Sequence, residues 1–524
     1  MTMPRKGLLY IIGAGFAGEA LVNEIRAKKI FGEVAAFLDD DTAKIGKKIN
    51  GVPVLGPVRD AAPLLRMNPA DEAIIALPSV SREYLAELYL ILKKAGFERI
   101  QILPGISQIV EGEAHLVQTR SIDPQDLLGR TPVTVNLKQS LAYLRGKRVL
   151  VTGAGGSIGS ELCRQLLSGG AERLFLFGHG ENSIYRIDRE LHLLQEEGVG
   201  EKAAIVPIIG DLKDRDYVDY IIGKLKAEVI FHAAAYKHVP MMEENPVAAI
   251  ENNFFGTMNL VDAARKHRVK RFVLITTDKA VEPVSVYGAS KYLSEQAVLA
   301  AASAARSRTV PADGGINDQG PHDSNCTEDS AGGNFMVVRF GNVLGSRGSI
   351  VPLFRQQIGK GGPVTVTDGE MRRFFMTIPE ACSLVLKAGG VGNNGNLYLL
   401  DMGEPVRIQD IAEQMIRFYG FEPHRDIKIE YIGRRAGERL DEPLWWPGER
   451  PVKTEYRRIL CVERNAPPGT ATPKTTTLDL PALTRALRPV VRFDPAFPGH
   501  YRNAALLRSI LKSHIPGIVA DHHE

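Results

Sequence analysis

Short apolar runs alternate with helix-like stretches along most of the chain. In the first part, runs of strand length stand at Gly7–Ile12, Val34–Leu38, Glu72–Ala76 and Arg99–Ile102, with helical periodicity at Glu19–Lys28 and Glu83–Ala95. A second series follows at Lys147–Thr152, Arg173–Phe177, Ala203–Gly210, Glu228–His232 and Arg271–Thr276. Strands that alternate with helices predict parallel sheets covered by helices on both faces. We therefore predict an α/β protein with two doubly wound parallel-sheet domains in tandem.

The chain is too long for a single hydrophobic core, since it has 524 residues. We predict a nucleotide-binding domain of Rossmann type over 1–104, a connector over 105–145 and a larger dinucleotide-binding domain over 146–446. Residues 302–334 are rich in Gly, Ser, Asp and Asn, which favours a disordered surface insertion. Beyond Pro447 the periodicity is weak, so 447–524 is interpreted as a C-terminal appendage.

Composition and charge exclude several classes of protein. The formal net charge of +4 is small for this length and no dense Lys/Arg tract is present, which argues against nucleic-acid binding. The four cysteines have no metal-type spacing, so we predict no metal site and a reducing, cytoplasmic location. No apolar stretch approaches the roughly 20 residues that a membrane helix needs, so no transmembrane segment is expected.

Two glycine-rich turns join a strand to a helix. Gly13, Gly15 and Gly18 follow the first strand, and Asp39 ends the next one. This spacing is typical of a dinucleotide site, because glycines let backbone N–H groups approach a pyrophosphate. The alternative is a tight turn without a ligand. A possible second nucleotide site is therefore predicted in the first domain.

The second turn opens the larger domain. It places Gly153, Gly156, Ser157, Ile158 and Gly159 between a strand and a helix, which predicts the principal cofactor site.

Four later strand ends extend this predicted site. No aspartate follows Arg173–Phe177, so Glu181 is the candidate ribose partner and the choice between NAD and NADP stays open. Asp211 and Leu212 are placed to meet the adenine ring, and Ala233 and Ala234 let the backbone lie flat against the cofactor. Close packing of a helix on the sheet would explain the alanines equally well.

The segment Leu274–Gln296 carries the candidate catalytic residues. Thr277, Asp278 and Lys279 follow a buried strand, and Tyr287 and Lys291 stand one helical turn apart. A nearby ammonium is expected to lower the pKa of a phenol, so that Tyr287 takes a proton from a sugar hydroxyl. The alternatives are a surface helix with a half-buried tyrosine and a solvated strand end.

Taken together, these segments resemble an extended short-chain dehydrogenase over roughly 147–445. The carrying stretches are Phe231–Pro246, Thr276–Pro283, Arg339–Phe354 and Phe374–Ala381. Within that superfamily they resemble the polysaccharide-biosynthesis UDP-N-acetylglucosamine 4,6-dehydratases. The segment Ile45–Gly56 is similar to an N-terminal domain found in sugar acyltransferases and polysaccharide-biosynthesis proteins. Longer members of the dehydratase family usually begin with membrane helices, which we do not find in this sequence.

The resemblance implies a function and a set of site residues. It implies NAD or NADP, tightly bound and regenerated in each turnover, a UDP-sugar substrate, a C-terminal substrate-binding lobe and a homo-oligomer. Substrate contacts are implied at six positions, where surface salt bridges are the alternative: Lys237, Asn342, Arg347, Arg373, Arg435 and Glu438. Position 436 is alanine where the family more often has proline.

The implied reaction is loss of water from the sugar. Tyr287 and Thr277 would serve the C4 hydroxyl, Lys279 would take the C5 proton and Asp278 would protonate the leaving C6 hydroxyl. For that role Lys279 needs a lowered pKa. Many family members carry methionine at position 287, and the tyrosine resembles members that invert C5.

Two other functions remain open. A UDP-sugar C4-epimerase shares the tyrosine, the lysine and the cofactor but has no need of Asp278 and Lys279. A non-catalytic dinucleotide sensor would keep the fold alone.

Overall fold

The computed structural model describes residues 7–28, 33–61, 65, 70–77, 80, 82–103, 120–121, 141–196, 198–200, 202–306, 333–464, 478–515 and 518. Most of the predicted connector over 105–145 and most of the predicted insertion over 302–334 lie outside these ranges. The chain separates into two compact units. Unit 1 comprises 1–134, 353–364 and 410–430, and unit 2 comprises 135–352, 365–409 and 431–524.

Unit 1 contains a seven-stranded sheet in the order β3-β4-β2-β1-β5-β6-β7. Strands β1 (Leu8–Ile12), β2 (Glu33–Leu38), β5 (Glu72–Ile75) and β6 (Arg99–Ile102) run parallel, as predicted. The remaining strands are β3 (Lys48–Ile49), β4 (Val52–Leu55) and β7 (Arg120–Ser121).

Helices bury both faces of this sheet. Alternate side chains of β1 enter two separate cores. Helix α3 (Arg82–Lys94) covers one face and α1 (Phe16–Lys28) covers the other.

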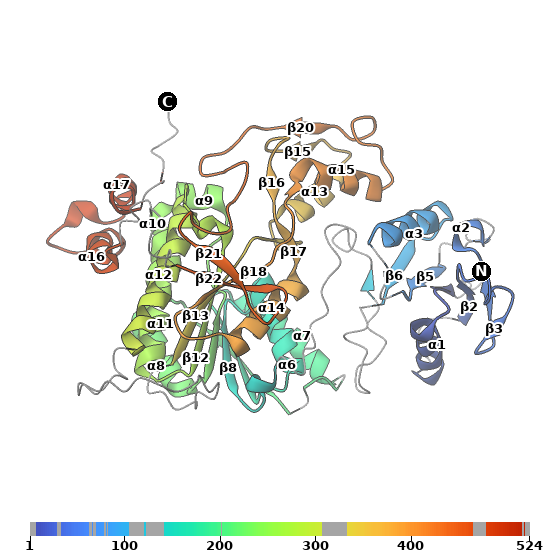
Figure 1. The fold of residues 1–524 in the computed structure, drawn as a ribbon, viewed down its shortest axis with the longest axis horizontal. Helices are drawn as coiled ribbons and strands as arrows, with labels where there is room; N and C mark the ends of the chain where they lie inside the picture. The colour runs from blue at the N-terminus through green and yellow to red at the C-terminus, as the bar shows by residue number, and fades with distance from the viewer. Residues whose placement is uncertain are drawn as a thin grey trace, which may run out of the picture. The chain divides into compact units, whose positions relative to one another are not determined.

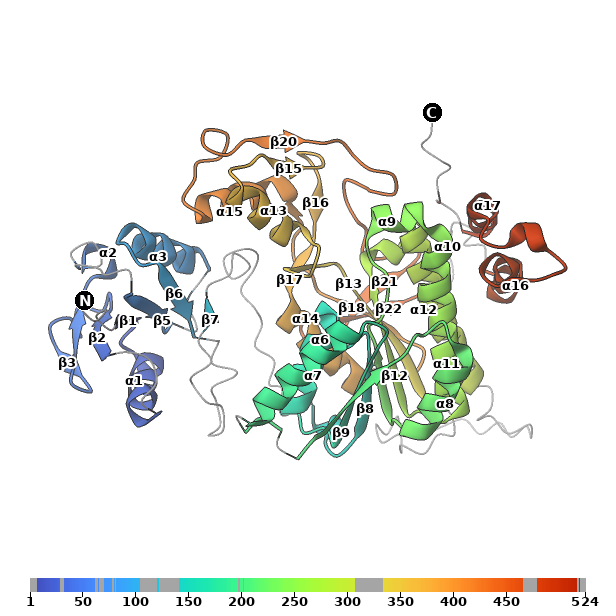
Figure 2. The same cartoon turned by 180° about the vertical axis from the view of Figure 1, so that it is seen from behind.

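Unit 2 is built on a nine-stranded sheet in the order β10-β9-β8-β11-β12-β13-β18-β22-β21 (Figures 1 and 2). The first seven strands are parallel: β8 (Arg148–Thr152), β9 (Arg173–Gly178), β10 (Ala204–Ile209), β11 (Val229–His232), β12 (Arg271–Thr277), β13 (Asn334–Phe340) and β18 (Leu397–Leu400). The strand order reverses between β8 and β11, which is where doubly wound sheets bind their ligands. The predicted α/β class is confirmed.

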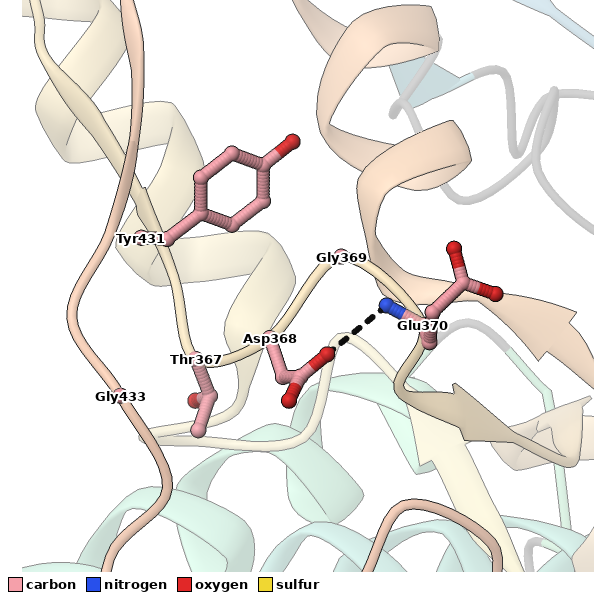
Figure 3. Close-up of a pocket in the computed structure, with 6 residues that line it drawn as sticks. All are labelled: Thr367, Asp368, Gly369, Glu370, Tyr431 and Gly433. Carbon is pink, nitrogen blue, oxygen red and sulfur yellow. Dashed lines mark hydrogen bonds between the residues drawn. The ribbon is translucent and has the colours of Figure 1, made fainter.

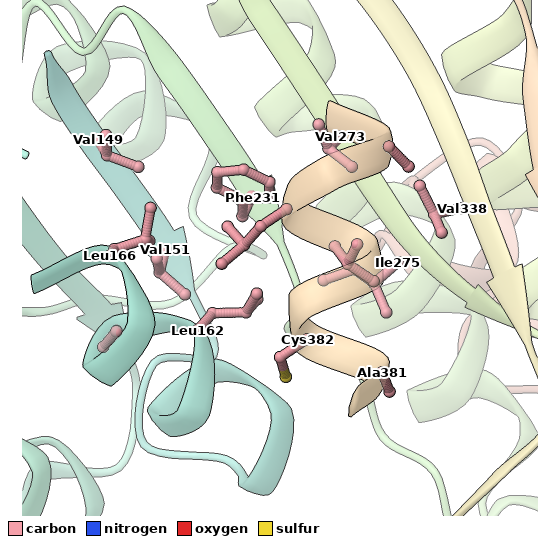
Figure 4. Packing of buried hydrophobic residues seen from close by; sticks show 14 of the residues in the cluster. Val149, Val151, Leu162, Leu166, Phe231, Val273, Ile275, Val338, Ala381 and Cys382 are labelled. Atoms are coloured by element: carbon pink, nitrogen blue, oxygen red, sulfur yellow. The ribbon is translucent and has the colours of Figure 1, made fainter. Parts of the chain in front are cut away.

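Two apolar layers cover the sheet of unit 2. One contains α6 (Ser157–Ser168), α7 (Glu181–Glu196) and α14 (Ile378–Val391). The other contains α8 (Arg215–Leu225), α11 (Gly256–Lys266) and α12 (Val286–Arg306). Figure 4 shows the first layer, where Val149 and Val151 of β8 meet Leu162 of α6 and Cys382 stands on α14. Leu150 of the same strand enters the opposite layer.

The chain beyond Pro447 differs from the predicted appendage. Strands β21 (Arg450–Lys453) and β22 (Ile459–Glu463) complete the edge of the main sheet by antiparallel pairing. Helices α16 (Leu480–Val491) and α17 (Ala504–His514) share one buried core with α12. These elements were not predicted because proline argues against a strand or a helix interior, and here Pro451 lies in an edge strand and Pro489 lies inside α16.

Leu487 tests whether the C-terminal helices belong to the core. Its side chain is fully buried in the cluster that also contains Tyr287. Leu487→Ala is expected to lower the free energy of unfolding by about 2–5 kcal/mol. Urea unfolding followed by tryptophan fluorescence measures this, since both tryptophans, Trp445 and Trp446, lie in unit 2.

The matched control is Arg485→Ala on the exposed side of the same helix, which should change stability by less than about 0.5 kcal/mol. Equal stability of the two variants would show that the helices are an appendage after all.

Candidate active site

The second glycine turn lies at the carboxyl end of β8. Gly153 has φ +67°, and a Cβ there would stand 2.7 Å from Cα of Ala234. A Cβ at Gly159 would stand 2.1 Å from the carbonyl oxygen of Gly153. Helix α6 starts at Ser157 with Gly156 as its N-cap. The turn therefore requires its glycines, and Gly153 lies directly against the backbone of Ala233 and Ala234.

The other predicted cofactor residues follow along the same edge. Ile158 packs on the core of unit 2, and Glu181 begins α7 directly after β9 ends. The carboxylate of Asp211 accepts the backbone N–H of Lys213 at 2.9 Å and pairs with its Nζ at 3.2 Å. Leu212 is buried, and its carbonyl accepts a hydrogen bond from Asn259 at 2.8 Å.

Arg347, which was predicted to contact the substrate, binds the glycine turn, and the predicted substrate residue Lys237 binds Arg347. Nη1 of Arg347 donates to the carbonyl of Gly155 at 3.0 Å, and its backbone N–H donates to Oγ of Ser157 at 3.1 Å. Nζ of Lys237 donates to the Arg347 carbonyl at 2.6 Å. Burial lowers the pKa of Lys237. One basic pair thus lies directly beside the predicted pyrophosphate position.

Thr277, Asp278 and Lys279 form a hydrogen-bonded cluster at the end of β12. The Thr277 hydroxyl donates to Oδ1 of Asp278 at 2.7 Å, and Nζ of Lys279 donates to the same oxygen at 3.0 Å. Lys279 also donates to Oδ1 of Asn342 at 3.0 Å. Asp278 is fully buried, and among the described residues its Oδ2 has no hydrogen-bond partner. The strand end therefore holds a fully buried acid paired with a lysine whose side chain is 20% exposed, and it is not a solvated terminus.

Tyr287 and Lys291 lie on the first turns of α12 and are both buried. Thr277 is a polar neighbour of the Tyr287 phenol. Burial raises the pKa of Tyr287, and the charge of Asp278 adds to this effect. Nζ of Lys291 donates to the carbonyl of Ile275 at 2.9 Å. The expected lowering of the Tyr287 pKa by Lys291 is therefore wrong for this structure, because desolvation dominates and the ammonium is bound to the strand.

Glu442 also belongs to this cluster, although the sequence did not predict it as a site residue. Its side chain is 6% exposed, and Oε1 lies 3.8 Å from Nζ of Lys279 and 3.5 Å from Nη2 of Arg373. Glu442 stands in an irregular segment far from Lys279 in the chain. No sequence pattern indicated this contact.

Asn253 was also missed as a site residue. It lies in a π-helix, Ile250–Phe255, and its amide joins both backbone groups of Tyr236 to Oγ of Ser290 on α12. Single π-turns inside helices are frequent at functional sites. The sequence feature that could have indicated this role is the pair of adjacent asparagines, Asn252 and Asn253, in a predicted helix that is buried in the structure.

Of the remaining predicted substrate residues, Arg373 is buried, whereas Arg435 and Glu438 form a turn at the surface. Arg373 is buried and donates to the carbonyls of Arg439 and Leu440, so it fixes the segment that carries Glu442. Arg435 and Glu438 close an exposed turn, in which the backbone N–H of Arg435 donates to Oε2 of Glu438 at 3.2 Å. These two do not join the Lys279 cluster.

The first glycine turn has the predicted geometry in unit 1. Gly13 has φ +103°, and a Cβ at Gly18 would lie 2.1 Å from the carbonyl oxygen of Gly13. Nothing crowds Gly15. Oδ2 of Asp39 accepts the backbone N–H of Ala14 at 2.6 Å. The acid and the turn are brought together, with one turn amide already engaged.

A separate pocket of about 440 Å³ lies near β20 (Ile429–Tyr431). Figure 3 shows its lining by Thr367, Asp368, Gly369, Glu370, Tyr431 and Gly433. None of the predicted catalytic residues lines it. Two carboxylates make it poorly suited to a phosphate.

Metal sites and membrane-spanning helices are both absent from the described residues. Across the described ranges, no group of His, Cys, Asp and Glu side chains could hold a metal ion. No described helix combines the length and apolar character needed to cross a membrane.

Comparisons with known proteins indicate the family of the chain. The family model for polysaccharide biosynthesis proteins matches residues 149–464. The capsular polysaccharide biosynthesis protein CapD of Staphylococcus aureus is 40% identical over 451 residues, which cover 86% of this chain and 70% of CapD. The UDP-N-acetylglucosamine 4,6-dehydratase (inverting) of Campylobacter jejuni subsp. jejuni serotype O:23/36 is 30% identical over 318 residues, covering 60% of this chain and 83% of that protein.

A solved structure has a similar fold. The X-ray structure of Pen from Bacillus thuringiensis is 28% identical, with a TM-score of 0.51 over 62% of this chain and 91% of that chain.

Lys291 allows a test of the buried site by pH. Burial lowers its pKa to about 8, whereas an unfolded lysine titrates near 10.4. Between these values the unfolded chain binds more protons, so stability should rise with pH. Lys291→Met should abolish this rise, which amounts to on the order of 2–3 kcal/mol.

The measurement is urea unfolding by tryptophan fluorescence between about pH 8 and pH 10. Lys512→Met, on the exposed side of α17, serves as the control and should retain the wild-type slope. An unchanged slope in Lys291→Met would mean that this lysine is not buried as a neutral amine.

Proposed function

The chain belongs to the polysaccharide biosynthesis protein family, and on that premise we propose that it is a nucleotide-sugar 4,6-dehydratase acting on UDP-N-acetylglucosamine. The observation that carries the proposal is the hydrogen-bonded Asp278–Lys279 pair, with its acid fully buried, beside Thr277 and Tyr287. Loss of water from a hexose needs an acid and a base in addition to the group that serves C4. The product would be a UDP-4-keto-6-deoxy sugar for surface polysaccharide or glycan synthesis.

A dinucleotide fits the glycine turn of unit 2. The missing Cβ atoms at Gly153 and Gly159 leave the backbone close to the start of α6, where an anion is stabilised. Residues of the turn, with Arg347 beside it, would hold the pyrophosphate of NAD or NADP. When bound, the nicotinamide supplies the hydride acceptor for C4 and later the hydride donor for C6.

The side chains divide the proton transfers among them. Tyr287 and Thr277 hold the C4 hydroxyl and accept its proton. The resulting ketone acidifies the C5 hydrogen, which Lys279 removes. Asp278 protonates the C6 hydroxyl, which leaves as water. The amide of Asn342 orients Lys279 from the far side of the ammonium.

The substrate nucleotide is assigned by resemblance. We propose that the turn from Arg435 to Glu438 contacts the uridine diphosphate from the C-terminal lobe, and that Arg373 holds the backbone of this segment in place. The tyrosine at position 287 favours inversion at C5, which agrees with the name of the Campylobacter relative.

A UDP-sugar C4-epimerase is the second candidate. It would use Tyr287 and Lys291 in the same way, but its reaction would not require Asp278 and Lys279. A dinucleotide sensor is disfavoured because the site keeps a buried tyrosine, lysine and acid together.

The first experiment is incubation of the purified protein with UDP-N-acetylglucosamine. We expect the mass of the sugar nucleotide to fall by one water, as seen by mass spectrometry. An unchanged mass with formation of UDP-N-acetylgalactosamine would establish the epimerase instead. Bound cofactor without turnover of any UDP-sugar would favour the sensor.

The second experiment assigns the base. Lys279→Ala should stop water loss and also stop exchange of the C5 hydrogen with deuterated solvent, lowering both by at least about 100-fold. Nuclear magnetic resonance of the sugar follows the exchange. Persistent exchange at C5 would mean that another residue is the base.

A further inference from the structure

Three oxygen atoms surround the ammonium of Lys279. Oδ1 of Asp278 and Oδ1 of Asn342 each lie 3.0 Å from Nζ, and Oε1 of Glu442 lies 3.8 Å away. An ammonium has three donors and no acceptor. Two of the three donors of Lys279 are hydrogen-bonded, and as an ammonium it cannot accept a proton from C5 until it has released one.

The cluster itself offers few acceptors for the proton of Lys279. Asn342 is an amide and does not accept it. Asp278 must be free to carry a different proton to the C6 hydroxyl. Glu442 is the remaining group, and its carboxyl is almost completely removed from solvent.

We propose that Glu442 is a positioning residue that reversibly takes the proton of Lys279 and so turns the lysine into the base for C5. This role rests on the proposed dehydratase function and extends it to a residue outside the Thr277–Lys279 segment.

The surroundings of Glu442 suit a carboxyl that changes its charge. The groups that face it are Lys279 and Asp278 from the end of β12, and Arg373 and Arg439 from its own side of the site. Burial raises the pKa of Glu442, while Lys279 and Arg373 oppose this effect. Arg373 keeps its bonds to backbone carbonyls when Glu442 becomes neutral, so no cation is left unpaired.

The same proposal gives the proton of the C4 hydroxyl a route from Tyr287 through Thr277 to Asp278. Tyr287 contacts Thr277, and the Thr277 hydroxyl donates to Oδ1 of Asp278 at 2.7 Å. Tyr287 accepts the C4 proton as its own passes to Thr277, and the Thr277 proton passes to Asp278. Asp278 thereby gains the proton that it later gives to the C6 hydroxyl.

The protons balance over one turnover. Asp278 and Glu442 begin as carboxylates and Lys279 as an ammonium. Lys279 gives its proton to Glu442 and then takes the C5 proton. Asp278 gives its proton to the C6 hydroxyl, the C–O bond at C6 breaks, and water leaves. After hydride returns to C6, Lys279 gives a proton back to C5 and recovers its own from Glu442. Each side chain ends in its starting state.

Glu442→Gln removes the proton acceptor and keeps the size of the side chain. In single turnovers with UDP-N-acetylglucosamine we expect water loss and C5 deuterium exchange to fall by at least about 100-fold. Formation of the reduced nicotinamide, followed by its absorbance, should stay within about threefold of wild type, because C4 oxidation does not use Glu442.

Two further variants keep the result interpretable. Glu442→Asp retains a carboxyl and should recover at least about tenfold of the activity lost in the glutamine variant. Asp441→Asn removes the exposed neighbouring carboxylate and should behave as wild type.

Three outcomes would overturn the assignment. Water loss unchanged in Glu442→Gln would exclude the proton transfer. An equal fall of C4 oxidation and water loss would show that Glu442 only maintains the shape of the site. Wild-type protein that releases no water from UDP-N-acetylglucosamine would contradict the dehydratase function itself, and the role of Glu442 with it.

Discussion

A single buried hydrogen bond fixes the geometry of the site. Nζ of Lys291 on α12 donates to the carbonyl of Ile275 on β12 at 2.9 Å. The strand ends two residues later in Thr277, and the helix carries Tyr287 one turn before Lys291. This bond therefore ties the helix that carries Tyr287 to the strand that leads into the Asp278–Lys279 pair. Leaving the buried amine of Lys291 without a hydrogen-bond partner would cost more free energy than the bond itself contributes, so the structure strongly favours this contact.

Desolvation then decides how the site titrates. Burial raises the pKa of Tyr287 and Glu442 and lowers the pKa of Lys291 and Lys237. Each of these four groups moves toward its neutral form. A site of this kind favours transfer of protons between neighbours over the storage of charge, since unpaired ions are costly away from water. The Asp278–Lys279 pair can hold charge there because each partner is hydrogen-bonded to the other.

Local patterns in the sequence predicted most of the sheet and half of the site. The glycine turns and the Thr277–Lys291 segment are short-range features, whose chemistry follows from a strand, a turn and a helix in order. Glu442 could not be found this way, because the contact depends on how Arg373 folds a distant loop. The pKa of Tyr287 was misjudged for a related reason: sequence shows which cation is near, but not how deeply the phenol is buried.

The C-terminal helices lie beyond the segment that the family model matches and pack against the helix that carries Tyr287. The family model ends at residue 464, whereas α16 and α17 follow it and bury the face of α12 that carries Tyr287 and Leu293. Arg508 on α17 donates to Oε2 of Glu243 at 2.7 Å, and Oε1 of Glu243 accepts the backbone N–H of Val286 at 2.7 Å. Glu243 thus satisfies an unpaired amide at the start of the catalytic helix, where a negative charge is also favoured by the helix dipole. In this chain the position of Tyr287 depends on elements that the shared catalytic segment does not contain.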